Sequence, residues 1–323
     1  MGKIVIVGTT HSGKSCYFYG MMKKMMRGIG GFSIGADGKD FGEIRQNIKK
    51  LSDINLPLAQ RFPPPSDKMR TYPLSLMYDF SELEKFDWVD YPGEHVSNSE
   101  ADFVALLEDA DCLLVCVDGE GIQGDPEELD DLADELVVTW DCLSLNNALN
   151  LASQKNENFP PVCIMVTKYD KLEPEFRNQD ILLELLKKVF PVLFHSGMGS
   201  GKDRMVLICP VTLGKDLDLG ARMSPKNMEI PICFATYLLQ ARKVKLIEQK
   251  NIEIVNANRS AVNEYNKKNP LLKLISSRPE PLTQEQLKVM QAIVDLGSAN
   301  VDALRDVIKD TPLYLNGEEV DWD

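Results

Sequence analysis

The feature that constrains this chain most is a short apolar run followed at once by the pattern G-x-x-x-x-G-K-S. Residues 4–7 are Ile-Val-Ile-Val, which predicts a buried strand, and the pattern begins at Gly8 and ends at Ser15. Its glycines let the backbone curl so that successive N–H groups point at an anion, and the helix beginning near Ser15 adds a partial positive charge. This arrangement indicates a phosphate-binding loop, or P-loop, between a strand and a helix of an α/β domain.

In such a loop the lysine reaches the β- and γ-phosphates of a nucleotide, and the serine hydroxyl ligates Mg²⁺. Lys14 and Ser15 occupy these two positions. A Gly/Ser turn that fits the pattern by chance is the alternative, and the strand in front of the loop argues against it. We expect nucleotide contacts from the loop residues Gly8, Thr9, His11, Ser12, Gly13, Lys14, Ser15 and Cys16.

A second motif follows the segment 86–89, which predicts another strand. Asp90 stands at the end of this strand and Gly93 lies three residues later. A carboxylate at this place can hold Mg²⁺ through water, and the glycine N–H can reach a γ-phosphate. We therefore expect Asp90 at the metal and Gly93 at the nucleotide.

A third motif, T-K-x-D, follows the apolar run 162–166 and contains Thr167, Lys168 and Asp170. Its aspartate accepts two hydrogen bonds from guanine N1–H and the 2-amino group, a donor pair that adenine lacks. The aliphatic part of the lysine lies along the base. Either of the last two motifs is common by itself, so the prediction of a guanine-nucleotide site depends on their order and their places at strand ends.

The three motifs together resemble those of the G domains of P-loop GTPases, the superclass of Ras-like proteins and translation factors. The resemblance covers about residues 1–240, and the wording Asp-Tyr-Pro-Gly-Glu is most similar to bacterial predicted GTPases. It implies a doubly wound, mostly parallel α/β sheet that binds GTP or GDP with Mg²⁺ at the carboxyl ends of the strands. It also implies that Lys14 and Glu94 are catalytic, with Glu94 orienting water where Ras-like proteins carry glutamine.

The remaining family motifs are faint. Thr212 and Leu213 follow the predicted strand 205–209 and would lie over the base, where Leu213 would offer a backbone N–H. The family also needs a Ser or Thr before its second strand to complete the Mg²⁺ shell. We expect Ser66, which follows a run of prolines, rather than Thr71, which lies close to the strand; ordinary loop residues are the alternative.

Two arginines near that loop are candidates for an arginine finger supplied by the chain itself. Arg61 and Arg70 both lie close to Ser66, and a solvated surface charge is the simpler interpretation of each. The stretch 27–65 is longer than a minimal switch loop, contains a predicted helix at 41–54, and is expected to face an effector.

The pattern of apolar runs supports the same fold class. Strands are expected at 3–7, 72–78, 86–90, 112–117, 162–166 and 205–209. Helices are expected to alternate with them, at 15–26, 100–107, 127–151, 179–193 and from Pro231 onward. We therefore predict a GTP-binding domain over residues 1–240, followed at 241–323 by a long helix and a small helical and hairpin docking module.

The C-terminal region offers two interpretations of one pattern. Between Pro231 and Pro270 there is no proline or glycine, and Val244, Asn251, Asn258 and Tyr265 alternate with Ile247, Ile254 and Ala261 at heptad spacing. This seam fits a homodimer through the long helix, or a helix that is packed on its own chain or exposed. Further helices are expected from a capping box at 282–285 to Leu296, with Gly297 ending the first, and at 301–308. A hairpin with an Asn-Gly turn is expected at 313–322.

Composition limits the partners. The formal net charge of −13 argues against nucleic acid or an anionic membrane as the main partner, and no apolar run is long enough to span a bilayer. The first strand begins at once, so no signal peptide is expected, and most of the seven cysteines fall in apolar runs, as in a reducing cytoplasm. We expect a cytoplasmic protein.

The expected function is a nucleotide-controlled switch that binds GTP, hydrolyses it slowly with Mg²⁺, and signals to a protein effector or activating partner. Its predicted metal ligands are Ser15, Ser66 and Asp90. Two alternatives remain open at this level: a GTP-binding scaffold that does not turn over, and an ATPase of the wider P-loop class in which T-K-x-D is accidental.

Overall fold

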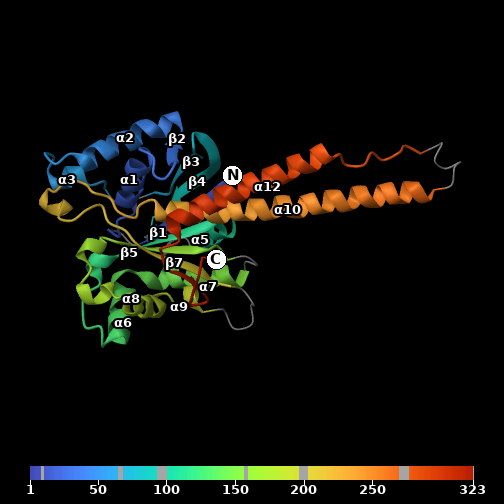
Figure 1. Ribbon diagram of the computed structural model, residues 1–323. Coiled ribbons are helices and arrows are strands. Elements are labelled where there is room, and N and C mark those ends of the chain that lie inside the picture. The colour runs from blue at the N-terminus through green and yellow to red at the C-terminus, as the bar shows by residue number, and fades with distance from the viewer. Residues whose placement is uncertain are drawn as a thin grey trace. The chain divides into compact units, whose positions relative to one another are not determined.

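The computed structural model describes residues 1–8, 11–64, 68–92, 100–155, 159–195, 203–268 and 276–322, and it divides the chain into two units (Figure 1). The first unit contains Met1–Ala235 and Val307–Asp323, and the second contains Thr236–Asp306. Among the described residues, no helix is both long and apolar enough to cross a membrane.

The first unit is built on one mixed sheet whose described strands follow the order β2-β3-β4-β1-β5-β6-β7-β8-β9. The strands are β1 (Gly2–Gly8), β2 (Phe32–Ala36), β3 (Arg70–Tyr78), β4 (Ser81–Asp90), β5 (Cys112–Asp118), β6 (Val162–Thr167), β7 (Met205–Pro210), β8 (Leu313–Leu315) and β9 (Glu318–Val320). The central strands β4, β1, β5, β6 and β7 are parallel, and both edges are extended by antiparallel strands. All six predicted strands are present, and the predicted fold class is confirmed.

Helices cover both faces of this sheet. They are α1 (Lys14–Met25), α2 (Gly38–Ser52), α3 (Leu58–Arg61), α5 (Glu100–Glu108), α6 (Leu129–Thr139), α7 (Cys142–Lys155), α8 (Gln179–Val189) and α9 (Pro191–Phe194). Short 3₁₀ turns follow several strands: η1 (Gly119–Gly121), η2 (Tyr169–Lys171), η3 (Pro174–Arg177) and η4 (Leu217–Leu219). The long helix α10 (Ile230–Lys267) begins in the first unit, and α12 (Gln284–Ile308) ends there.

Alternation along the strands explains the two layers. Successive side chains of a strand point to opposite faces, and the central strands are buried on both faces, so they are apolar throughout. Val5, Val7 and Val115 share one core with helices α5 to α9. On the other face, α1 packs on the sheet through Tyr17 and Phe18, whose rings lie 6.1 and 5.4 Å from that of Trp88.

Two helices and one strand differ from the sequence prediction. The expected helix 127–151 is two helices, because the chain turns at Asp141 with φ 51° and buries Trp140 in the core. The expected helix 179–193 is interrupted before Pro191, whose ring and missing N–H favour the start of a new turn, α9. The edge strand β2 lies inside the stretch that was predicted only as a loop with one helix.

The C-terminal hairpin forms as predicted but in a different place. Asn316 and Gly317 both have positive φ, 53° and 85°, as an Asn-Gly hairpin turn requires. Its first strand, β8, pairs with β7 and so extends the main sheet. The two units therefore differ from the predicted division into 1–240 and 241–323, because residues 307–323 belong to the first unit. The hairpin in this segment pairs with β7, which would otherwise be an open edge of the sheet.

The second unit is a helical hairpin of α10 and α12. The Asn251 side-chain amide donates to Met290 O at 3.4 Å, and that of Asn258 donates to Glu280 O at 2.9 Å. The seam residues therefore contact the same chain, which is the second of the two interpretations given above. Ile254, predicted in the seam, is 50% exposed, and Val255 is half-buried in its place. Likewise Val262 is half-buried and the predicted seam residue Ala261 is exposed. The buried face of a straight helix shifts gradually relative to a seven-residue repeat, which explains both differences.

Gly297 does not end a helix. It lies inside α12, and a Cβ at this position would lie 2.7 Å from Val244 Cγ2. The glycine thus permits close approach of the two helices, which outweighs its poor helix propensity. The predicted capping box at the start of α12 is present, because Gln286 N–H donates to Thr283 Oγ1 at 3.2 Å and Gln286 Oε1 accepts from Thr283 N–H at 2.9 Å.

Candidate functional site

The turn between β1 and α1 has the geometry of a P-loop. Gly8 has φ 155°, and a Cβ there would lie 2.6 Å from Cys116 O on the neighbouring strand. Gly13 directly precedes α1 with φ 88°, a conformation that side chains other than glycine rarely adopt. The backbone at both positions therefore requires glycine. The N-terminus of α1 follows the loop directly, where its free N–H groups could bind a phosphate.

Lys14 is the first residue of α1 and is 8% exposed. Its ammonium donates a hydrogen bond to Gly8 O, across the loop. A buried cation at a helix N-terminus attracts an anion strongly, because little water competes for the cation. Lys14 is thus placed to act on a phosphate chain.

Asp90 ends β4, the strand beside β1, and pairs in register with Ile6. It therefore lies at the same sheet edge as the P-loop. Burial raises the pKa of the neighbouring Cys116 thiol to about 12; the charge of Lys14 opposes this rise and that of Asp90 adds to it. Asp90 thus stands at the end of the strand beside the one that leads into the P-loop.

The guanine motif is joined to the P-loop by a side chain. Thr167 Oγ1 lies 2.7 Å from Ser12 O and 3.0 Å from Val117 O, so its hydroxyl donates between the P-loop and β5. Lys168 follows in the left-handed region, with φ 47°. This turn directs the chain from the end of β6 into η2, which carries Asp170.

The loop after β7 reaches back to the guanine motif. Thr212 Oγ1 donates to Asp170 Oδ1, and Gly214 N–H donates to Thr212 Oγ1 at 3.0 Å. Leu213 lies against α1, since a Cβ on Gly20 would lie 2.5 Å from Leu213 Cδ2. The loop after β7 thus contacts both the guanine motif, through Thr212, and α1, through Leu213.

A chain of ion pairs surrounds Lys168 and was not predicted from the sequence. The Lys168 ammonium lies 2.7 Å from Asp118 and 3.0 Å from Glu120. Glu120 also pairs with Lys171 at 2.7 Å, and Lys171 pairs with Asp218 at 2.9 Å. Burial lowers the pKa of Lys168, but the two carboxylates outweigh it and raise the value. Hydrogen bonds from Lys171 are the main cause of the lowered pKa values of Glu120 and Asp218.

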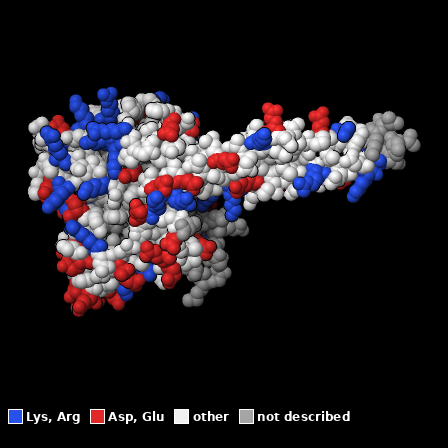
Figure 2. Space-filling view, in the orientation of Figure 1, with Lys and Arg blue, Asp and Glu red and all other residues white. Residues whose placement is uncertain are grey.

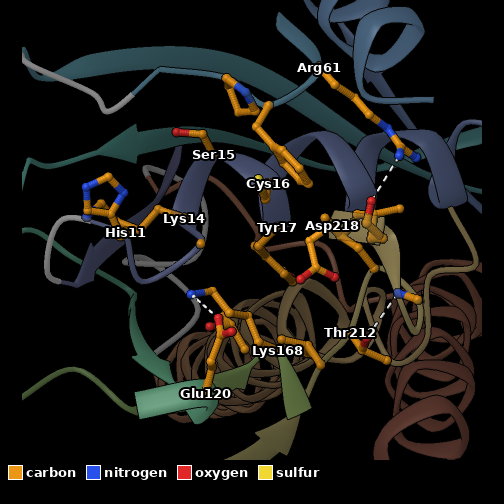
Figure 3. Close-up of a pocket in the computed structure, with 18 of the residues that line it drawn as sticks. His11, Lys14, Ser15, Cys16, Tyr17, Arg61, Glu120, Lys168, Thr212 and Asp218 are labelled. Atoms are coloured by element: carbon orange, nitrogen blue, oxygen red, sulfur yellow. Dashed lines mark hydrogen bonds and ion pairs between the residues drawn. The ribbon is translucent and has the colours of Figure 1, made fainter. Parts of the chain in front are cut away.

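These elements enclose a cavity of about 970 Å³ (Figure 3). Its wall includes ten of the predicted nucleotide-binding residues: His11, Gly13, Lys14, Ser15, Cys16, Thr167, Lys168, Asp170, Thr212 and Leu213. His11 and Lys14 lie at one end in Figure 3, and Arg61 and Asp218 lie at the other. The volume is at the upper end of the range for small-molecule sites.

Residues that sequence reasoning missed also line the cavity: Tyr17, Asn47, Lys50, Glu120, Lys171, Asp218 and Met228. Glu120 follows the end of β5, so the rule that ligands meet the carboxyl ends of parallel strands would have found it. Asn47 and Lys50 come from α2 and carried no such signal, because only the folded insertion brings α2 to the cavity.

Several predicted residues have other positions. Thr9, Ser66, Gly93 and Glu94 lie outside the described residues. Gly8, Ser12 and Asp90 are described but are not among the lining residues. Thr71, the other candidate for the switch-loop ligand, is an exposed residue within β3. Among the described residues, no three or more His, Cys, Asp or Glu side chains are grouped to hold a metal ion.

The two candidate arginine fingers have different settings, and only Arg70 is a surface residue. Arg61 is buried and donates to three backbone carbonyls, those of Leu51, Leu217 and Ala221. Arg70 begins β3 and pairs with Glu43 at 2.9 Å. The expectation of a solvated surface arginine is therefore wrong for Arg61, because the α2–α3 insertion folds over it.

Known proteins resemble the chain in fold. One is the GTPase-like domain of Saccharomyces cerevisiae Ski7 bound to GTP, at 13% identity and a TM-score of 0.39, covering 67% of this chain and 44% of that one. Another is a bacterial selenocysteine-specific elongation factor, EF-Sec, at 16% and 0.33, covering 68% and 27%. A third is SelB from Methanococcus maripaludis with the GTP analogue GppNHp, at 13% and 0.31, covering 67% and 31%.

The chain thus spans less than half the length of these solved proteins. No protein-family model matches it, and the comparison with curated proteins returned no match. At these identities the likeness to the three solved structures concerns the fold alone.

Proposed function

We propose that this chain binds GTP and GDP with Mg²⁺, hydrolyses GTP slowly, and acts as a nucleotide-controlled switch for a protein partner. The observation that carries the proposal is that one cavity joins two recognition elements. Gly13, Lys14 and Ser15 line it as a phosphate cradle, and Asp170 lines it as an acceptor for the guanine edge. The Thr167 hydroxyl bridges these elements, which keeps their separation constant.

The donors present fit Mg²⁺. Ser15 offers a hydroxyl from the first turn of α1, and Asp90 offers a carboxylate at the end of β4, the strand beside β1. Hard oxygen ligands with few protein contacts are typical of Mg²⁺ beside phosphates. We propose Ser15 as a direct ligand, Asp90 as a ligand through water, and Ser66 as the ligand from the switch loop. When bound, the ion would neutralise charge on the phosphates.

The roles of the remaining groups follow from charge development. Lys14 would stabilise negative charge on the β- and γ-phosphates, and the P-loop N–H groups would act with it. Gly93 would contact the γ-phosphate, and Glu94 would orient the attacking water. Thr9 completes the predicted cradle. Because a carboxylate replaces the usual amide at Glu94, we expect slow hydrolysis without a partner.

Equilibrium competition of GTP, GDP, ATP and xanthosine triphosphate for the purified chain with Mg²⁺ tests the base assignment. A clear preference for both guanine nucleotides is expected. Equal or tighter binding of ATP would overturn the guanine assignment and move the chain to another P-loop class.

Single-turnover hydrolysis of bound GTP tests the enzymatic part. A rate above background that Glu94→Ala reduces is expected. Tight GTP binding with no turnover would instead favour the alternative of a GTP-binding scaffold, since the site would then bind GTP without hydrolysing it.

The partner-facing surface belongs to the same proposal. Figure 2 shows basic side chains gathered over α2, which carries exposed Lys39, Arg45, Lys49 and Lys50. An acidic group lies over α6 on the same unit. We propose that the insertion with α2 faces the effector, and that the arm of α10 and α12 is a docking element. A homodimer through this arm would use faces other than the seam, and sedimentation velocity tests it.

A cytoplasmic location fits the thiols. All seven cysteines lie in the described residues and each is a free thiol. Burial raises the pKa of Cys142 to about 12, so it is a poor nucleophile at neutral pH. A reducing compartment accounts for such unpaired cysteines, and we propose the cytoplasm on this basis.

A further inference from the structure

Arg61 is the last residue of α3 and is 1% exposed. Its Nε donates to Leu51 O at 2.9 Å, Nη1 to Leu217 O at 3.0 Å, and Nη2 to Ala221 O at 2.7 Å. One planar guanidinium thereby ties the end of α2 to both ends of the turn around η4. A lysine could not do this, because its ammonium lacks the fixed fork of donors.

That turn is also held from its other side. The Asp218 carboxylate, within η4, accepts from Lys171 Nζ at 2.9 Å. Lys171 follows Asp170 directly and also donates to Glu120 at 2.7 Å. Glu120 pairs with Lys168 of the guanine motif at 3.0 Å. The sequence of contacts therefore runs from the insertion, through the turn, to the residues that flank the guanine reader.

All of these side chains line the same cavity; in Figure 3 Arg61 and Asp218 lie at the end opposite His11 and Lys14, while Lys168 and Glu120 lie below Lys14. We name the set Arg61, Glu120, Lys168, Lys171 and Asp218 the base-end ring. It joins the α3 wall of the cavity to the guanine loop. A purine seated against Asp170 would be enclosed by this ring, and the phosphates would lie at the other end, beside Lys14.

We propose that Arg61 and the Lys171–Asp218 ion pair are positioning groups that close the base end of the cavity and set the rate of nucleotide release. The inference rests on the proposed function. Release requires the α3 wall and the η4 turn to separate, which breaks the three Arg61 hydrogen bonds or the ion pair. Arg61 and Asp218 lie at the end of the cavity opposite Lys14 in Figure 3, so they slow GDP and GTP release by the same factor.

The first experiment measures dissociation of fluorescent N-methylanthraniloyl GDP and GTP, chased with unlabelled nucleotide, from the full chain. Arg61→Met keeps the length of the side chain and removes its donors, and dissociation is expected to be about tenfold faster or more for both nucleotides. Arg61→Lys is expected to be intermediate. Arg45→Met is the matched control, because Arg45 is an exposed arginine of α2 outside the cavity lining.

A second variant leaves the buried hydrogen bonds intact, in case Arg61→Met does not fold. Asp218→Asn removes the ion pair at a carboxylate that is 46% exposed. It is expected to speed dissociation a few-fold and to reduce the acceleration that added salt produces in the unaltered chain, because salt screens exposed ion pairs.

Unchanged dissociation in Asp218→Asn, with its salt dependence also unchanged, overturns the inference. So does an Arg61 variant that slows hydrolysis but leaves release unaffected, since that is the signature of a finger. An effect confined to GTP contradicts it as well. If the unaltered chain binds no guanine nucleotide, the proposed function itself fails, and that result is distinct from the other three.

Discussion

Thr212 Oγ1 donates a hydrogen bond to Asp170 Oδ1, and the same hydroxyl oxygen accepts a hydrogen bond from Gly214 N–H at 3.0 Å. The loop after β7 therefore orients the carboxylate that would read guanine. A carboxylate already aligned loses less entropy when it binds, so this contact raises affinity without touching the ligand.

Replacing Thr212 with valine keeps the shape of the side chain and removes the hydrogen bond to Asp170. Hydrogen bonds to charged groups contribute about 1.5–3 kcal/mol, so GDP affinity should fall by about 10-fold to 100-fold. Titration with a fluorescent GDP analogue measures this. Thr212→Ser restores the donor and should bind as the unaltered chain does; equal affinity of the valine variant would show that Asp170 needs no support.

Replacing Asp170 with asparagine exchanges an acceptor for a donor at the position facing the 2-amino group. Guanine then meets an unmatched donor, whereas xanthine presents a carbonyl there that the amide can satisfy. We expect guanine nucleotides to bind at least about 100-fold more weakly and xanthine nucleotides to bind more tightly. Competition assays with GDP and XDP check this, and retained guanine preference would place the base elsewhere.

Replacing Gly8 with alanine should destabilise the first unit by about 1–3 kcal/mol, as overpacking does. The new Cβ would lie 2.6 Å from a backbone oxygen, that of Cys116, which has little room to move. Gly42→Ala is the control, because a Cβ at that position in α2 meets nothing within 4 Å and should stabilise by about 0.5–1 kcal/mol. Chemical denaturation of the two variants should therefore shift in opposite directions.

Replacing Gly297 with alanine should loosen the pairing of α10 and α12. The added methyl group would lie 2.7 Å from Val244 Cγ2, and valine has few rotamers with which to avoid it. Hydrogen exchange of α12 amides should become faster in Gly297→Ala and return toward the original rate when Val244→Ala is added. Additive effects of the two changes would mean that they do not share this contact.

The base-end ring predicts a specific pH dependence of stability. The pKa values of Glu120 and Asp218 are lowered in the folded chain, so their stabilisation is present above the ordinary values of 4.5 and 3.8. It is lost as the pH falls through the lowered values. The difference in urea midpoint between the unaltered chain and Glu120→Gln should therefore shrink from pH 7 to pH 3. A constant difference would show that the Glu120 charge does not act in the fold.

Several structural features could be predicted because they depend on neighbours in the chain. The alternation of apolar runs with helical segments gave the order of strands and helices, and an Asn-Gly pair gave the hairpin turn. The two P-loop glycines also follow from local backbone geometry, since Gly8 and Gly13 have positive φ in the structure.

Other features depended on partners distant in sequence. Arg61 looked like a loop cation, yet its hydrogen-bond acceptors Leu217 and Ala221 lie more than 150 residues away. Gly297 was predicted to end a helix, because the sequence alone does not distinguish a glycine that ends a helix from one that packs closely against another helix. The hairpin likewise joined the main sheet because β7 offered a free edge.

The sequence by itself determined the fold class, the P-loop and the order of the motifs, because strand periodicity and glycine conformation act over a few residues. The tertiary structure alone decided which charged side chains surround the cavity, that α2 and α3 form one of its walls, and that the asparagine seam of α10 pairs within the chain. A polar side chain can be buried only where hydrogen-bond partners surround it, and those partners come from segments that are distant in sequence. Only the folded chain brings such segments together.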